Sequence, residues 1–285
     1  KWHGWFIDGD RYDVKFDASV GSVLKDYYTV PTDMSRPNQP VQVRSYMEQG
    51  YRIKRLWYEY TENGVKKTQE ISTETMQFTM PNAPVTIKAE REATTMTVRV
   101  NGDDNLKFTG KGLWDCMAQF NKKGGKYHVD IHKLEIIGGY VVSGDWQRLI
   151  NIGALEELEI ASTVTFVESP REYYYNVRFI PGKVHSLLLR KVRYVPTHFI
   201  DGLQNLASVR LPDVKEMAET SINYINVNDQ NSTLELGLPG TAVPKVGPEP
   251  FWNQYLPRSR YLVMIDTDGK ELPSNQLDNA KKLYK

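Results

Sequence analysis

The feature that most limits what this chain can fold into is a short apolar figure that recurs along its second half. In the stretch VPTHFIDGLQNLASVRLP, residues 195–212, Leu206, Val209 and Leu211 form the figure φ-x-x-φ-x-φ, where φ is apolar. The last two positions are spaced as on one face of a half-buried strand. Leu203 and Leu206 lie three residues apart, which is a helical spacing. The stretch therefore predicts one helical turn followed by one short strand.

The same figure recurs at a nearly constant interval. Its last apolar positions follow one another in steps of 24, 29, 22, 25 and 27 residues, close to the roughly 20–29 residues of a leucine-rich repeat. We therefore expect a short solenoid of parallel strands whose leucines share one interior. The other copies are Ile131, Leu134 and Ile136; Leu155, Leu158 and Ile160; Val184, Leu187 and Leu189; Leu234 and Leu236; and Tyr261 and Val263, or Leu262 and Met264 in the other phase.

The amino-acid sequences of two copies resemble one group of such repeats. The stretch 195–212 is similar to the BspA-like leucine-rich repeat family, whose units run I-P-x-x-A-F-x-x-C-x-x-L-x-x-V-x-L-P, although Gly202 replaces the common cysteine. A partial second match is Val243–Gly247 followed by Phe251. The resemblance implies a bacterial surface protein, and the irregular copies leave the regularity of the curvature open.

Residues 1–93 predict a separate β-rich module. Tyr12, Val14 and Phe16 alternate with charged residues, and Asn63-Gly64 joins two alternating segments, which is the strongest short signal for a hairpin. The module resembles the internalin B-repeat-like modules, which are small β-grasp-like units of surface proteins. The residues that carry this resemblance are Gly50, Tyr51, Ile53, Trp57, Phe78–Pro81 and Pro84–Ile87, and in that family the tryptophan helps to frame the core.

The second domain, 94–285, needs covers for the first and last apolar layers of its stack. Residues 112–120 predict an N-terminal capping helix with Leu113, Cys116, Met117 and Phe120 on one face. We expect Cys116 to be packed in the core. Residues 273–283 predict a polar helix that caps the other end. The expected fold class is thus mixed β and α/β.

Composition excludes several classes of partner. The 36 Lys and Arg residues nearly balance the 35 Asp and Glu residues, giving a net charge of +1, so charge does not favour nucleic acid. No apolar run is long enough to span a bilayer, so we expect no membrane insertion within this chain. No charged-then-apolar leader follows Lys1, and we expect any export signal to have been removed from a secreted or surface protein.

The motif search gives no catalytic or metal site. His128 and His132 are four apart but lie in a segment that reads as a strand, where they would be about 13 Å apart. Asp266–Gly269 starts like a calcium loop, but Leu277 stands where that loop needs glutamate. No nucleophile elbow, phosphate loop or zinc-protease motif is present. We expect a protein without enzymatic activity or cofactor. An enzyme whose site is assembled from distant residues is a further hypothesis, beside the two binding functions given below.

The predicted register indicates which side chains face away from the core of the repeats. Broad strand faces of this kind suit protein or glycan partners rather than small substrates. A charged stripe is also what solubility alone would require. The predicted binding residues are Lys133, Glu135, Glu157, Glu159, Leu188, Arg190, Ser208, Arg210 and Glu235.

Two binding functions follow from this organisation. The first is adhesion or protein recognition through the strand face, with a host or microbial protein or glycan as partner. The alternative is a carbohydrate-binding or glycan-utilisation accessory protein that uses exposed aromatic residues. Its candidate residues are Tyr173–Tyr175, Trp252 and Tyr255.

Overall fold

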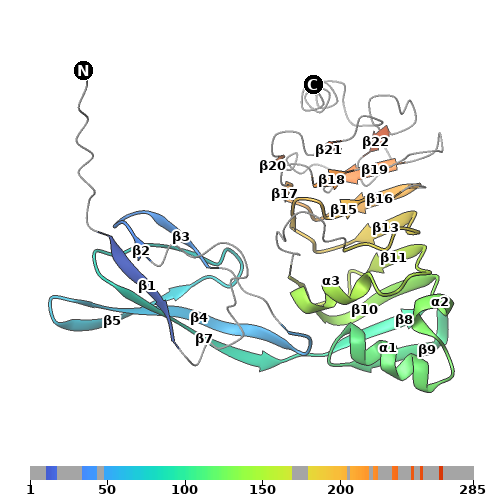
Figure 1. The fold of residues 1–285 in the computed structure, drawn as a ribbon, viewed down its shortest axis with the longest axis horizontal. Coiled ribbons are helices and arrows are strands. Elements are labelled where there is room, and N and C mark those ends of the chain that lie inside the picture. The colour runs from blue at the N-terminus through green and yellow to red at the C-terminus, as the bar shows by residue number, and fades with distance from the viewer. Residues whose placement is uncertain are drawn as a thin grey trace. The chain divides into compact units, whose positions relative to one another are not determined.

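The chain divides into two compact units, Lys1–Ala93 and Thr94–Lys285, and the sequence analysis places its domain boundary at the same position. Both units are rich in strands, and their sheets mix parallel and antiparallel pairs. The computed structural model, drawn in Figure 1, describes residues 11–17, 34–43, 48–168, 179–203, 206–217, 221–223, 233–236, 245–246, 251–252 and 263–265. The predicted capping helix at 273–283 lies outside these residues.

The first unit contains a mixed five-stranded sheet. Its order is β2 (Met34–Ser35), β1 (Tyr12–Phe16), β7 (Val85–Ala93), β4 (Tyr51–Glu62) and β5 (Val65–Ile71). β1 runs parallel to β7, whereas the other pairs are antiparallel. A second, two-stranded sheet joins β3 (Pro40–Gln42) to β6 (Gln77–Thr79).

The hairpin predicted between β4 and β5 is confirmed. Asn63 and Gly64 form its turn with φ angles of +51° and +75°, as a type I′ turn requires. Tyr58 packs on Phe78 with ring centroids 4.4 Å apart, in the core of the unit. Trp57 does not frame this core, contrary to what the resemblance implies. Because it follows Leu56 in a strand, it lies on the other sheet face, under the guanidinium of Arg55.

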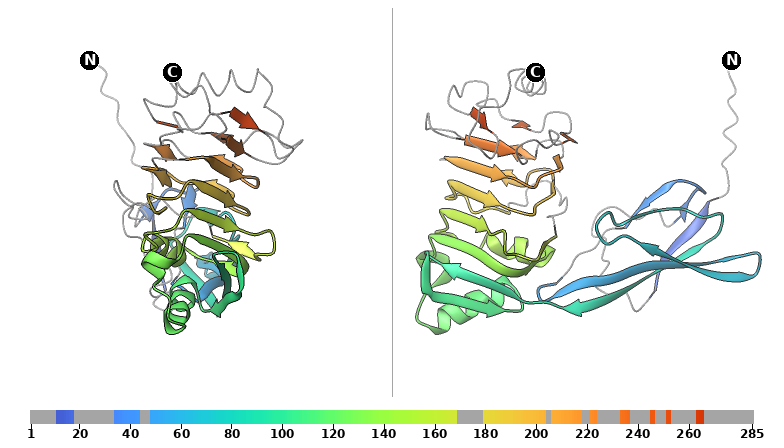
Figure 2. Two further views of the ribbon diagram at one scale, coloured as in Figure 1. Left: turned by 90° about the vertical axis from the view of Figure 1, so that its right-hand side faces the viewer. Right: turned by 180° about the vertical axis from the view of Figure 1, so that it is seen from behind.

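The second unit is organised around one long sheet, in which the predicted strands lie parallel and all but the last have the predicted register. The order is β22 (Val263–Ile265), β19 (Thr233–Leu236), β16 (Ser208–Leu211), β13 (Ser186–Leu189), β11 (Glu157–Ile160), β10 (Lys133–Val141), β8 (Met96–Val100) and β9 (Asp103–Gly110). Leu134, Leu158, Leu187, Val209 and Leu234 stand opposite one another in turn. Figure 1 and the two views in Figure 2 show these strands stacked one above another.

The last strand has a register that differs from both predicted phases. Met264 stands opposite Leu234, where the sequence analysis placed Leu262 or Tyr261. The slip is two residues relative to the phase of Leu262 and Met264, and three relative to the phase of Tyr261 and Val263. Alternation alone does not distinguish registers that differ by two residues.

Two further three-stranded sheets consist of two-residue parallel strands. β14 (Tyr194–Val195), β17 (Glu216–Met217) and β20 (Lys245–Val246) pair in parallel, as do β15 (Ile200–Asp201), β18 (Ile222–Asn223) and β21 (Phe251–Trp252). β12 (Phe166–Val167) pairs with the end of β10. The side chains of Trp146, Phe179 and Phe199 pack together between these layers, with centroids 5.2 and 5.8 Å apart.

The helix predicted at 112–120 is present as α1 (Leu113–Lys122), with all four predicted core residues, Cys116 included, buried. It packs on the side of β8 and β9 that carries Val98 and Phe108. Burial raises the pKa of the Cys116 thiol to about 12. One side chain of α1 and the side chain of the residue after it also bind the backbone of β9. Gln119 Nε2 donates to Thr109 O at 2.8 Å, and Lys123 Nζ, just after the helix, donates to Asn105 O at 3.2 Å.

One buried carboxylate joins α1 to α3 (Ser143–Leu149). Asp145, which is 2% exposed, accepts hydrogen bonds from Leu113 N at 2.8 Å and Val142 N at 2.9 Å. It thereby satisfies one free N–H at the start of each helix. Desolvation raises the pKa of Asp145 to about 7, although the two backbone donors act in the opposite direction. Glu168 Oε2 accepts from Ser143 N at 2.9 Å and supplies a nearby negative charge.

This carboxylate predicts a pH dependence of the second unit. Because the folded pKa of about 7 exceeds the unfolded value of about 3.9, the folded state binds the extra proton between these values. The stability that Asp145 contributes is therefore fully present below about pH 4, and it is lost as the pH rises through about 7. Between pH 5 and 8 we expect the unfolding free energy to drop by about 2 kcal/mol. Urea unfolding at each pH measures it, and Asp145→Asn should remove the slope.

Candidate functional site

The outer face of the long sheet carries its side chains in rows that run across the strands. Because parallel strands pair residue by residue, Lys133, Glu157, Ser186, Ser208 and Thr233 share one row. The second row contains Arg99, Glu135, Glu159, Leu188, Arg210 and Glu235. We call this surface the strand face.

The predicted binding residues all lie on or just beyond this face, but they differ in how far they reach solvent. Glu135 is buried, with 6% of its side chain exposed. Glu235 occupies its register position in β19. The remaining seven are half-buried: Lys133, Glu157, Glu159, Leu188, Arg190, Ser208 and Arg210.

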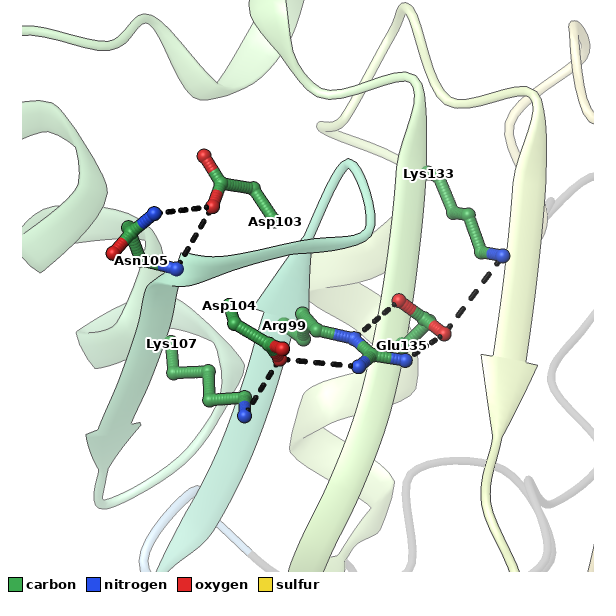
Figure 3. A network of polar contacts seen from close by, with 7 residues as sticks. All are labelled: Arg99, Asp103, Asp104, Asn105, Lys107, Lys133 and Glu135. Atoms are coloured by element: carbon green, nitrogen blue, oxygen red, sulfur yellow. Dashed lines mark hydrogen bonds and ion pairs between the residues drawn. The ribbon is translucent and has the colours of Figure 1, made fainter.

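Glu135 is buried because Arg99 of the neighbouring strand β8 and Lys133 of its own strand β10 close over it (Figure 3). Arg99 donates from Nε to Oε2 at 2.8 Å and from Nη2 to Oε1 at 2.7 Å, which is a bidentate pair. Lys133 Nζ lies 3.8 Å from the same carboxylate and 3.6 Å from Glu157. Arg99 also donates to Asp104 Oδ1 at 3.2 Å. This part of the strand face is therefore satisfied by the chain itself.

The pair of Arg99 and Glu135 predicts the order of stability of the parent chain, a single variant and a double variant. Arg99 lowers the pKa of Glu135, so the pair stabilises the fold above the ordinary glutamate pKa and is lost as pH falls through the lowered value. Arg99→Met should lower the urea midpoint because a buried carboxylate loses its main partner. Arg99→Met with Glu135→Leu should recover more than half of that loss. A double variant no more stable than the single one would contradict the account.

The middle of the strand face carries charged side chains that are not neutralised by ion pairs. Within the described part of the chain, Glu159 has no ion-pair partner, and Glu135 beside it is already neutralised. Arg190 directly follows β13 and likewise makes no ion pair with any residue that the structure describes. From strand geometry the two are about 8 Å apart, with Leu188 between them. The face thus presents an anion, an apolar side chain and a cation in a short space.

In the part of the chain that the structure describes, the histidines are not grouped with other metal-ligand side chains. His128 lies in α2 (Tyr127–Asp130), not in the strand that the sequence predicted, because four residues carry too little periodicity to show a helical turn. His132 Nδ1 contacts Glu156 Oε1 at 3.3 Å. Among the described residues, no three His, Cys, Asp or Glu side chains are grouped as metal ligands.

The sequence analysis missed one exposed aromatic residue. Trp114 in the first turn of α1 is 45% exposed, and its ring contacts Tyr127 of α2. The signal that could have indicated its exposure is its position outside the apolar face of the predicted helix. The proposed sugar-stacking residues Tyr173–Tyr175 and Tyr255 lie outside the described residues, and Trp252 is placed only as part of β21.

Comparison of the chain with protein-family models, with curated proteins and with solved structures finds no match. Within the described residues, none of the helices has the length and apolar character needed to cross a membrane.

Proposed function

We propose that the second unit is a leucine-rich repeat solenoid of a secreted or surface-exposed bacterial protein, and that it recognises a macromolecular partner through the strand face without catalysis. Residues 1–93 would serve as a β-grasp-like spacer module. The resemblance to BspA-like and B-repeat-like proteins motivates the class, and fold alone does not determine function.

The observation that supports a binding role is the unneutralised centre of the strand face. Glu159 and Arg190 keep their charges available, and Leu188 offers an apolar contact between them. Arg99 and Glu135, by contrast, neutralise each other. A flat array of parallel strands gives the breadth that a protein or glycan chain needs. Opposite charges about 8 Å apart favour a partner with its own pair of opposite charges, because complementarity gives specificity.

The test measures binding of the full chain to purified probes on a biosensor, with fibronectin, fibrillar collagen, mucin and bacterial cell-wall polysaccharide as the panel. Arg190→Glu should weaken binding to a recognised probe at least tenfold. Lys183→Glu is the matched control, because Lys183 is exposed in the turn just before β13 and the charge change is the same. We expect this control to change affinity less than twofold.

Two results would refute the strand face as the binding surface. One is equal binding of both variants and the parent chain to the probe that binds best. The other is failure of the whole panel to bind under low-salt conditions, where charge complementarity acts most strongly.

A further inference from the structure

The helices of the second unit carry an aromatic surface that the strand face does not explain. Tyr127 meets the Trp114 ring at 71° with centroids 5.5 Å apart, and His128 meets Tyr127 at 80° and 5.4 Å. The guanidinium carbon of Arg148 in α3 lies 5.4 Å from the Trp114 ring centroid. These four side chains form a continuous row across α1, α2 and α3, which we call the aromatic row.

Apolar exposure is concentrated around this row. Of the five large hydrophobic residues exposed in the described part of the chain, three belong to these helices or the residue after them: Trp114, Val129 and Ile150. Single exposed apolar side chains need no explanation, whereas Trp114 also contacts the Tyr127 ring and lies beside the Arg148 guanidinium.

The aromatic row itself carries one cation, Arg148. Asp115 and Asp130, the acidic residues of α1 and α2, each accept a backbone N–H, from Lys111 at 3.1 Å and Lys126 at 2.7 Å respectively. Their carboxylates therefore point back at the chain. Arg148 is exposed and keeps its guanidinium beside the indole.

The size and chemistry of the row favour a sugar over a protein. A stable protein interface needs about 1,000 Å² or more of well-packed contact, and three separate apolar side chains do not supply it. An indole matches the apolar face of one pyranose ring, and a planar guanidinium binds a carboxylate through two parallel hydrogen bonds. Tyr127 and His128 add polar groups for hydroxyls.

We propose that the aromatic row binds a carboxylate-bearing sugar, with the ring on Trp114 and the carboxylate on Arg148. Uronic acids and sialic acids share this chemistry. The site goes beyond the proposed function, because α1 packs on the core side of β8 and β9 and the strand face is the opposite side.

The test uses the full chain and calorimetric titration with four probes. The acidic probes are trigalacturonate and 3′-sialyllactose, which distinguish the two sources, and maltotriose and lactose are their neutral counterparts. We expect at least one acidic probe to bind at least tenfold more tightly than its neutral counterpart. Trp114→Ala should reduce this binding at least tenfold. Arg148→Met should abolish the preference for the acidic probe and retain the weaker binding of the neutral one.

Met34→Ala is the control, because this residue of the first unit is 44% exposed, like Trp114. It should leave binding unchanged. Trp114 is exposed, so its replacement should leave the melting temperature within a few degrees, and the same samples check this. Equal binding of acidic and neutral probes, unchanged binding by Trp114→Ala, or no sugar binding at all would each overturn the proposal.

Discussion

Replacing Gly139 with alanine should destabilise the second unit by about 3 kcal/mol or more. Gly139 has a φ of +80°, which L-residues adopt at a cost of about 1–2 kcal/mol. A Cβ at this position would lie 2.0 Å from the carbonyl oxygen of Thr95, a backbone atom that cannot rotate away. That oxygen also accepts from Tyr140 N at 2.9 Å, so its displacement would break the pairing of β8 with β10.

The measurement is calorimetric unfolding of the full chain, in which two units give two transitions to assign. Gly182→Ala is the control, because a Cβ there would meet nothing within 4 Å. It should change stability by about 0.5 kcal/mol or less. Leu56→Ala, in the core of the first unit, identifies the transition that Gly139→Ala should leave unchanged. Similar shifts for the two glycine variants would contradict the positive-φ account.

Replacing Leu187 with alanine should cost about 2–5 kcal/mol, the range for large-to-small changes in a packed core. Its side chain is fully buried, and it stands between Leu158 and Val209 in the stack. A cavity here therefore removes contacts with the periods on both sides. In the proposed solenoid each period contacts only its neighbours, so the loss should uncouple the two ends. Hydrogen exchange should then show faster opening of β16 than of β10.

Leu188→Ala tests the same strand from the other side. Leu188 is half-buried on the strand face, so its truncation should cost about 1 kcal/mol or less. The two variants remove the same atoms from adjacent positions of β13 and differ only in the face they occupy. Comparable destabilisation by both would show that the assigned inside and outside of the sheet are wrong.

The parts of the fold that the sequence predicted are those in which one periodicity holds for several residues. Leu158 and Ile160, or Leu187 and Leu189, alternate with half-exposed residues, so each strand fixes its own inner face. Five copies at similar spacing then fix the parallel register. Leu113, Cys116, Met117 and Phe120 likewise identify the buried face of α1 at helical spacing.

The parts that it did not predict depend on partners distant in sequence or on segments too short for a pattern. Glu135 has the alternation of a surface residue, and it is buried chiefly because Arg99, from the antiparallel strand β8, pairs with it. The two-residue strands β14 and β15 have no periodicity to detect. The aromatic row requires Trp114 and Tyr127 to meet between two helices, and the second of those helices has four residues.

The hydrogen bonds from Gln119 and Lys123 to the carbonyl groups of β9 have a consequence for self-association. β9 is the outermost strand at its end of the long sheet, where free backbone groups could recruit a strand from another molecule. Because Asn105 O and Thr109 O already accept hydrogen bonds, β9 offers a poor template for fibril growth. We therefore expect a strand from another molecule to add less readily beside β9 than beside an edge strand whose carbonyl groups are all free.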